Sequence, residues 1–580
     1  MSAKHFVNDP THLVTSALHS LTLTNPSIAL DVDNKIIYRR PSPGAAPQVS
    51  IISGGGSGHE PSFAGMVGQG MLSGAVAGTI FASPSAEQIR TAITSRVDTS
   101  KGVLVTVMNY TGDVLNFGMA VEKAKAAGLA VEMVVVGDDV GVGRAKAGKV
   151  GRRGIAGTVL VHKISGALAA LGRPLDEVAA VARLTAANLV SVGASLEHVH
   201  VPGRNIATEG GLEDGEVEVG MGIHNEPGSE RSKLELPELV GKMLEQLLNP
   251  NDKDRAFVDF NSSNETILLI NNLGGVSVLE LGGITAEVAS QLETKHGIRP
   301  VRTLSGTFMT SLNGLGFSIS LLQVVPHKFD APGIVGLLDA SAEVVGWSGP
   351  IQTSTWDAKN DGTRTDSSGI AQETKPSGLK MDASVAQSSL KKALERVIAA
   401  EPEVTRYDTV VGDGDCGIGL KRGAEGVLKH IKEHPLTGDV VVDVAAIVAV
   451  VENTMDGTSG ALYAIFLNAL VHAFRTLGSG DASPAVWHKA LKLSNEALSK
   501  YTPARPGDRT LVDALYPFVD VLGQTSDIKQ AAEAARKAAD ETKGMQASLG
   551  RSVYVGGSGY QEVPDPGAWG LACFFLGLTE

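Results

Sequence analysis

The pattern of hydrophobic positions divides the chain into two regions. From about residue 50 to 350, short apolar runs alternate with Ala-rich segments whose apolar positions recur every three or four residues. Residues 48–52, 102–108 and 129–136 are strand-like, and residues 114–127 have a clear helical period. An alternation of buried strands and amphipathic helices is typical of an α/β domain with a largely parallel sheet. The first half of the chain is therefore predicted to be α/β.

A change of pattern near residue 195 suggests two α/β subdomains, about 1–195 and 196–350. A glycine-rich turn over 53–59 is predicted to lead into a helix from Ser62, and residues 173–193 are predicted to form one long helix. The strand-like and helical segments of the second subdomain are 217–220, 266–270, 301–304, 318–325, 234–248 and 286–296.

The second half of the chain has helical periodicity throughout. Residues 351–382 are mostly polar and lack an apolar period, which predicts a linker between domain 1–350 and domain 383–580. Beyond it we expect eight helices joined by short loops, and therefore an all-α domain. The predicted helices are 383–401, 423–434, 439–455, 459–477, 483–500, 510–522, 528–545 and 567–578.

Composition and charge exclude several classes of protein. The 580 residues carry a net charge of −13 with no long basic run, which argues against a nucleic-acid partner. Two cysteines cannot form a disulfide framework or a four-thiolate zinc site. The longest clean apolar run, 444–451, is far short of the roughly 20 residues that span a bilayer, and residues 1–10 have no signal core. A cytoplasmic, non-membrane protein is expected.

Three carboxylates lie close together at Asp408, Asp413 and Asp415. Such a cluster repels itself unless a cation neutralises it, and hard oxygen ligands favour magnesium or calcium. A calcium EF-hand is excluded because its twelfth position would be Ala424 instead of Glu. Gly417, which follows the cluster, would let backbone N–H groups approach phosphates. The alternative is an acidic, capped loop without a ligand.

Three further segments of the helical half are candidates for binding phosphate. They hold residues that suit a helix N-terminus or phosphate neutralisation, although each is equally compatible with an ordinary cap or turn. These residues are Thr458, Ser459, Gly507, Arg509, Asp565, Pro566 and Gly567.

Histidines and a carboxylate occupy glycine-flanked turns in the α/β half. His59 stands in Gly-Gly-Gly-Ser-Gly-His-Glu-Pro, Asp113 ends Asn-Tyr-Thr-Gly-Asp, and His224 follows Gly-Met-Gly-Ile. Ligands of α/β sheets bind beyond the carboxyl ends of strands, and His and Asp are suited to general acid–base chemistry. A lone loop histidine is more often a surface residue, but three such turns together favour a catalytic site.

Together these segments resemble the single-chain, ATP-dependent dihydroxyacetone kinases, also called glycerone kinases, over nearly the whole chain. The resemblance implies that His224 forms a covalent hemiaminal with dihydroxyacetone, and that His59 and Asp113 handle the hydroxyl that attacks ATP. It implies that Asp408, Asp413 and Asp415 hold two Mg²⁺ ions within a helical barrel. D-glyceraldehyde is expected as a second substrate, and the protein as a homodimer.

The resemblance also assigns binding residues. Those implied for the ketone are Gly55, Gly56, Ser57, Gly58, His59, Met108 and Asp113. Those implied for the nucleotide are Asp415, Cys416, Gly417, Ile418, Thr458, Ser459, Gly507, Arg509, Asp565, Pro566 and Gly567. At position 108 many members of the family have Lys, so a role of the Met108 side chain is in question.

Two other functions compete with the kinase. Some members of the family cyclise FAD to a riboflavin cyclic phosphate, which would use the same nucleotide site with manganese as the alternative metal. Kinase-like chains can also become non-catalytic regulators, although the presence of His59, Asp113, His224 and the three aspartates argues against this here.

Overall fold

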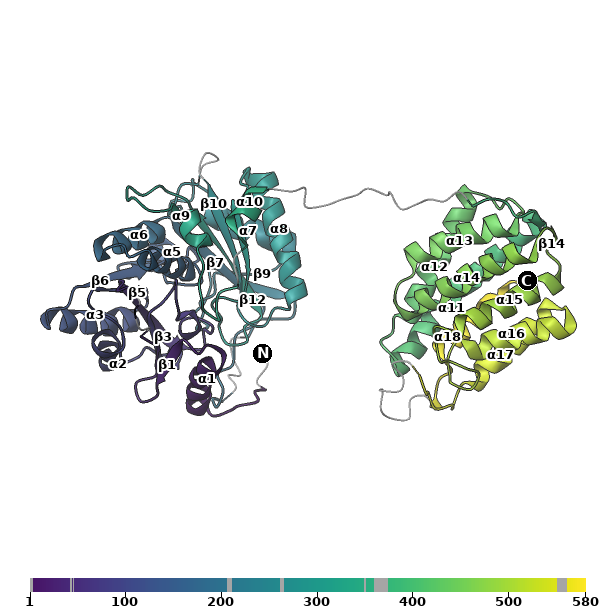
Figure 1. The fold of residues 1–580 in the computed structure, drawn as a ribbon, viewed down its shortest axis with the longest axis horizontal. Coiled ribbons are helices and arrows are strands. Elements are labelled where there is room, and N and C mark those ends of the chain that lie inside the picture. Colours follow the sequence, from purple (N-terminus) through teal and green to yellow (C-terminus); the bar gives the residue numbers. More distant parts are fainter. Residues whose placement is uncertain are drawn as a thin grey trace. The chain divides into compact units, whose positions relative to one another are not determined.

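A computed structural model of the chain forms two compact units, residues 1–363 and 364–580 (Figure 1). The structure describes residues 4–41, 44, 46–205, 211–260, 265–348, 351–358, 374–549 and 561–580. The first unit is α/β, and the second is helical apart from the two-residue strands β13 (Leu379–Lys380) and β14 (Gly480–Asp481). Both fold classes agree with the predictions from the sequence.

The first sheet of the α/β unit has the strand order β1-β2-β4-β3-β5-β6. In this order the strands are Ile28–Asp31, Ile36–Arg39, Gly74–Ile80, Ser50–Ser57, Val103–Met108 and Val131–Val136. Strands β4, β3, β5 and β6 are parallel, whereas β1 and β2 are antiparallel to their neighbours. All residues of β3 and β5 are buried. The sheet is therefore largely parallel, as predicted.

The second sheet has the order β11-β10-β12-β7-β8-β9, and only β10 and β11 are parallel. In this order the strands are Arg302–Gly306, Thr266–Asn272, Gly316–Gln323, Leu189–Ser195, Glu216–Val219 and Glu230–Lys233. The prediction of one helix over 173–193 is wrong, because α6 (Leu175–Ala187) ends before β7. Both faces of β7 are buried, so polar and apolar residues do not alternate along it. Its short apolar run therefore cannot be distinguished by periodicity from the preceding Ala-rich helix.

Helix α5 (Thr158–Ala170) is buried along almost its whole length. One continuous hydrophobic core joins it to β3 and β5 of the first sheet and to β10 of the second. The two predicted subdomains therefore share a core. The other helices of this unit are α1 (Pro10–Thr24), α2 (Ala86–Thr91), α3 (Thr111–Ala126), α4 (Arg144–Ala147), α7 (Leu236–Leu248), α8 (Val278–His296), α9 (Ile334–Asp339) and α10 (Thr353–Ala358).

Two local predictions in this unit need correction. The glycine-rich segment 53–59 is not a turn, because β3 continues to Ser57, and the predicted helix from Ser62 is only a 3-10 turn over Ala64–Met66. Of the predicted linker 351–382, the structure describes residues 351–358, which include α10, and 374–382, which include β13 of the second unit.

The second unit contains eight helices among its described residues. They are α11 (Ala383–Val411), α12 (Cys416–Glu433), α13 (Val440–Thr454), α14 (Gly457–Leu477), α15 (Pro484–Leu498), α16 (Val512–Thr525), α17 (Ile528–Glu541) and α18 (Pro566–Gly577). Helix α11 passes through Pro402, where the sequence predicted an end, and α12 begins seven residues earlier than predicted. The loop between them is therefore short and carries Asp413 and Asp415, while Asp408 lies in the last turn of α11.

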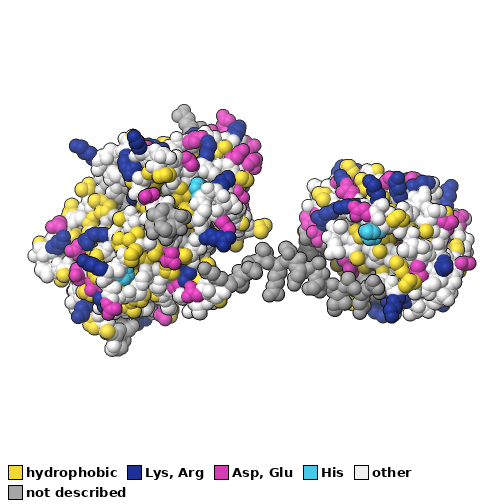
Figure 2. Space-filling view, turned by 90° about the horizontal axis from the view of Figure 1, so that it is seen from above, with side chains coloured by type: hydrophobic (Ala, Val, Ile, Leu, Met, Phe, Trp, Pro, Cys, Tyr) yellow, Lys and Arg dark blue, Asp and Glu magenta, His cyan; other side chains and the backbone are white. Residues whose placement is uncertain are grey.

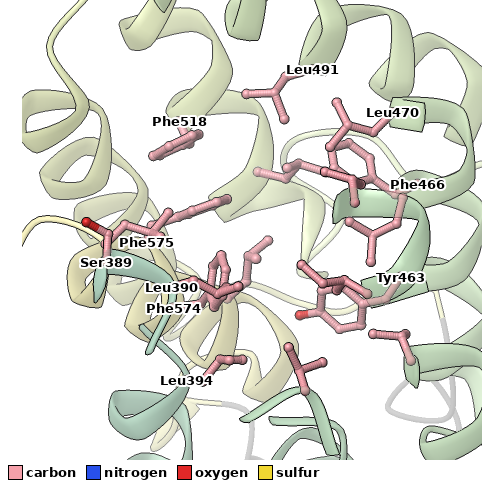
Figure 3. A pocket seen from close by; sticks show the side chains of 18 of the residues that line it. Ser389, Leu390, Leu394, Tyr463, Phe466, Leu470, Leu491, Phe518, Phe574 and Phe575 are labelled. Atoms are coloured by element: carbon pink, nitrogen blue, oxygen red, sulfur yellow. The ribbon is translucent and has the colours of Figure 1, made fainter. Parts of the chain in front are cut away.

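These helices enclose an apolar cavity of about 560 Å³ (Figure 3). Phe466 and Leu470 of α14, Phe518 of α16 and Phe575 of α18 point into it, and the Phe518 and Phe575 rings stack with centroids 3.8 Å apart. By length and composition α14 could cross a membrane. Its apolar side chains are accounted for instead by this internal cavity.

Candidate active site

A pair of histidines lies at the carboxyl end of β3. His59 follows this strand and is fully buried. Its Nδ1 is 2.9 Å from the carbonyl oxygen of Thr310, which can only accept, so Nδ1 carries the proton and donates. Its Nε2 lies 3.1 Å from Nε2 of His224. Burial, followed by the neighbouring His224, lowers the pKa of His59 to about 3. His59 is therefore neutral and presents a lone pair to His224.

His224 lies in the turn after β8 and is held by Glu226. The His224 Nδ1 donates to Glu226 Oε1 at 2.9 Å, and the His224 backbone N–H donates to Oε2 at 2.9 Å. Burial of Glu226 alone would raise its pKa, but the hydrogen bonds and charge of His224 outweigh this effect and lower it to about 2. Glu226 is therefore an anion beside the histidine at neutral pH.

Two aromatic rings enclose His224. Phe81 meets it edge-on with centroids 5.1 Å apart and stacks on His59 at 5.3 Å. Phe81 has φ of 59°, a left-handed conformation that a bulky residue adopts rarely and that often marks a functional site. On another side the Tyr110 ring lies 4.9 Å from His224, and its buried hydroxyl has no hydrogen-bond partner in the described structure.

Asp113 completes this site from the first turn of α3. Its carboxylate is buried, and Oδ1 has no hydrogen-bond partner within the described residues. Burial raises the pKa of Asp113, and the nearby Ser83 and His224 oppose this only in part. A methyl group added at Gly55 would come within 3.8 Å of Asp113 Oδ2 and 2.9 Å of Phe63. Glycine at position 55 therefore leaves space beside a carboxyl group that can exchange a proton.

Some residues of the predicted ketone site have structural contacts. Ser57 donates to the Gly78 carbonyl at 2.9 Å, and the Gly58 N–H donates to Glu60. Gly56 packs against the backbone of Phe81, the residue that follows β4. The Met108 side chain is buried and belongs to the hydrophobic core. Its contact with the ketone stays a prediction.

The three aspartates of the helical unit gather between α11 and α12. One carboxylate oxygen from each of Asp408, Asp413 and Asp415 lies within 4.8 Å of the others. Asp408 is buried and accepts from the Cys416 N–H at 3.0 Å, whereas the other two are exposed. Gly414, between the exposed pair, has φ of +82°, which suits glycine. Three hard oxygen donors at this spacing fit Mg²⁺.

Helix N-termini gather beside these carboxylates. Helix α12 begins at Cys416, whose Sγ lies 3.9 Å from the Ser459 hydroxyl in the first turn of α14. Asp565 starts α18 by accepting from the Ala568 N–H at 2.8 Å, and burial raises its pKa to about 7. Asp408 adds to this shift by charge repulsion. Since helix N-termini attract anions, this region suits a phosphate beside the carboxylates.

The remaining residues predicted to bind the nucleotide differ in their exposure and hydrogen bonding. Ile418 is 53% exposed, although it is apolar. Gly417, Thr458, Pro566 and Gly567 belong to the helix starts described above. Arg509 is 1% exposed, and its guanidinium donates to the carbonyl groups of Thr542 and Val563, while its Nη1 has no hydrogen-bond partner among the described residues. Its role toward phosphate stays a prediction. The Gly507 N–H already donates a hydrogen bond to the Asp513 carboxylate.

Sequence reasoning assigned no role to four residues that contact the histidine pair. Tyr110 stood inside the quoted Asn-Tyr-Thr-Gly-Asp motif, and Glu226 follows His224 by two residues. An aromatic residue in a motif or an acidic residue beside a motif histidine is the signal that could have identified them. Phe81 and Thr310 are distant in sequence from His59 and His224, so no local pattern could have done so.

Comparisons with known proteins agree with this arrangement. The Dak1 domain matches residues 19–344, and the DAK2 domain matches residues 410–580. Dihydroxyacetone kinase 2 of Saccharomyces cerevisiae is 42% identical, covering 100% of this chain and 99% of that protein. Triokinase/FMN cyclase of Homo sapiens is 36% identical, with the same coverage. The crystal structure of the dihydroxyacetone kinase from C. freundii in complex with AMP-PNP and Mg²⁺ gives a TM-score of 0.65 at 31% identity, covering 100% of this chain and 99% of that one.

An ATP-dependent phosphotransferase is the class of enzyme that these two units define. Since both domain models match in order and the relatives align from end to end, the chain belongs to the dihydroxyacetone kinase family.

Proposed function

We propose that this chain transfers the γ-phosphoryl group of ATP to dihydroxyacetone, and also to D-glyceraldehyde. The observation that carries the proposal is the His59–His224 pair, enclosed by Phe81 and Tyr110 with Asp113 nearby. This site has groups for proton transfer, as phosphorylation of a hydroxyketone requires. The relatives named dihydroxyacetone kinase support the same substrate.

His224 is proposed to bind the ketone covalently. Its Nε2 would bond to the carbonyl carbon and form a hemiaminal, which orients a substrate that offers little apolar surface. Asp113 and His59 would then handle the proton of the terminal hydroxyl group that attacks the γ-phosphorus. Burial raises the pKa of Asp113, which favours proton exchange with a bound hydroxyl group.

Asp408, Asp413 and Asp415 are proposed to hold magnesium, two ions being expected. When bound, the metal would neutralise phosphate charge, the main requirement of phosphoryl transfer. The first turns of α12, α14 and α18 would hold the phosphates through their N–H groups. Exposed Ile418 would offer an apolar contact to the base.

ADP release in the presence of magnesium and ATP tests the proposal. With dihydroxyacetone the protein should release ADP, and without it the rate should fall to background. Glycerol is the control substrate, because it carries the terminal hydroxyls but has no carbonyl group to bond His224. Phosphorylation of glycerol as efficient as that of dihydroxyacetone would contradict the covalent mechanism.

FAD cyclisation is the second candidate function, because Triokinase/FMN cyclase of Homo sapiens aligns over the whole chain. It would use the nucleotide site without His224. Incubation of FAD with manganese should then yield riboflavin cyclic phosphate, and His224→Ala should leave that yield unchanged. A non-catalytic regulator would show neither activity. Cytoplasmic localisation and a homodimeric state remain predictions of the sequence.

A further inference from the structure

A hydrogen-bonded line of four groups passes through the histidine pair. It runs from the Glu226 carboxylate to His224, from His224 to His59, and from His59 to the carbonyl oxygen of Thr310, with separations of 2.9, 3.1 and 2.9 Å. Both ends of the line are acceptors, and this fixes where the protons lie.

The proton positions follow from the two ends. Thr310 accepts from Nδ1 of His59, so Nε2 of neutral His59 has a lone pair and must be the acceptor toward His224. Glu226 accepts from Nδ1 of His224. His224 therefore donates from both ring nitrogens and is an imidazolium ion paired with the Glu226 carboxylate.

We propose that Glu226 is a positioning residue for the covalent step: it fixes the His224 ring and keeps the proton on Nδ1, so that only Nε2 can bond to the ketone. This inference rests on the proposed function of His224 as the nucleophile. The arrangement resembles the role of a carboxylate that orients a catalytic histidine through its second nitrogen.

The covalent step moves one proton through His59. The Nε2 proton of His224 moves to Nε2 of His59, and the freed lone pair forms a bond to the carbonyl carbon. The π electrons of the C=O bond move to oxygen, which takes the proton from His59 and becomes a hydroxyl group. The low pKa of His59, about 3, makes its protonated form a ready donor. The His224 ring is a cation before and after the step, so the Glu226 charge opposes it throughout.

Other groups around His224 are consistent with this assignment. The ionisable ones are His59 at the end of β3, Tyr110 and Asp113 at the start of α3, and Glu226 on its own turn. Arg153, which interacts electrostatically with Glu226, is already paired with Asp139 at 2.7 Å. Glu226 is therefore the group that accepts a hydrogen bond from Nδ1 of His224.

Carbon-13 NMR of the full chain with [2-¹³C]dihydroxyacetone tests the proposal without turnover. The wild type should convert the ketone signal into that of a tetrahedral carbon. Glu226→Gln should lower the adduct's equilibrium constant about 10- to 100-fold, because the unbound His224 ring is then no longer held in one orientation and one tautomer. It should also lower, by about one unit or more, the pH at which the ring of the adduct loses its Nδ1 proton, because the adduct's imidazolium loses its counter-charge.

Glu218→Gln is the matched control, because Glu218 is a buried acid on the neighbouring strand that binds the Gly228 N–H and His198. It should leave unchanged both the adduct's equilibrium constant and the pH at which the adduct's ring loses its Nδ1 proton. If Glu226→Gln weakens the adduct without moving this pH, as a variant that only perturbed the turn would, the positioning role is wrong. No adduct in the wild type would instead overturn the covalent step itself.

Nitrogen-15 NMR of the wild-type histidines is a second measurement that needs no variant. Near neutral pH, His224 should show two protonated ring nitrogens and His59 a neutral ring protonated at Nδ1. A neutral His224 protonated only at Nε2 would overturn the inference even if Glu226→Gln failed to fold.

Discussion

Burial affects two histidines of the α/β unit in the same direction, with different consequences. His59 and His162 are both fully buried, and burial lowers the pKa of each to about 3. His59 uses both ring nitrogens in hydrogen bonds, whereas neither nitrogen of His162 has a partner among the described residues. His162 packs in the core against the edge of the Phe63 ring. We therefore treat His59 as part of the site and His162 as a core residue that destabilises the fold at low pH.

Replacing His162 by Leu should remove part of the pH dependence of stability. The folded-state pKa lies below the unfolded value of 6.5, so the unfolded chain binds more protons and stability is lost as pH falls below about 6.5. Each pH unit between about 6 and 4 should lower the free energy of unfolding by about 1.4 kcal/mol more in the wild type than in the variant. Denaturant unfolding at pH 7, 6 and 5 measures this difference. Parallel pH profiles would contradict the burial argument.

Asp415→Asn should separate metal binding from folding. Removing one carboxylate of three relieves repulsion in the metal-free protein but weakens the magnesium site. Turnover of ATP should fall by about 100-fold or more, with an unchanged or slightly higher melting temperature without metal.

Asp520→Asn is the control for this variant, because Asp520 is an exposed aspartate on α16 away from the cluster. Its turnover should match the wild type. A large loss of metal-free stability in Asp415→Asn would favour the acidic-loop alternative, in which the carboxylate only shapes the loop.

Among the helices and strands, those with a single hydrophobic face could be predicted from the sequence. Helix α17 is amphipathic, with buried alanines on one face, and its start at Ile528 was predicted correctly. Helix α5 is buried on all sides and strand β4 is rich in glycine, so neither presents a period to recognise. Long-range packing, which no local pattern records, determines both.

The residues of the candidate site could be predicted from local motifs, but their proximity in the fold could not. His59, Asp113 and His224 could be found because each lies in a glycine-flanked turn at the end of a strand or the start of a helix. Their mutual distance could not, since the turns are brought together only by the two sheets. The inward-facing Arg509 was not predictable either, because a polar turn gives no sign of burial.

Two glycine substitutions should show how closely β3 and β4 are packed. A methyl group added at Gly54 would lie 2.2 Å from the Val76 carbonyl oxygen, so Gly54→Ala must separate the strands. It should lower the free energy of unfolding by more than about 2 kcal/mol. Gly282→Ala on α8 is the control, because a methyl group there meets nothing within 4 Å and should stabilise the helix by about 0.5–1 kcal/mol. Equal melting temperatures for the two variants would contradict the packing shown here.

On the scale of the whole molecule, the two kinds of chemistry lie in different units. His59, Asp113 and His224 lie in residues 1–363, while Asp408, Asp413 and Asp415 lie in residues 364–580. Each unit has hydrophobic cores of its own. On the faces shown in Figure 2, acidic and basic side chains are interspersed over each unit. Because each unit is large and has its own cores, we expect each to fold alone.

Fragments 1–358 and 374–580 should fold separately and divide the reaction between them. The first should form the His224 adduct with [2-¹³C]dihydroxyacetone but release no ADP, and the second should bind magnesium and ATP without kinase activity. Mixing them should restore part of the turnover, at a rate that rises with concentration, because the covalent connection no longer supplies a high effective concentration. A mixture of 1–358 carrying His224→Ala with wild-type 374–580 is the control and should stay inactive. If either fragment fails to show a cooperative melting transition, the two units depend on each other for folding, and the division of the chain proposed from its sequence is wrong.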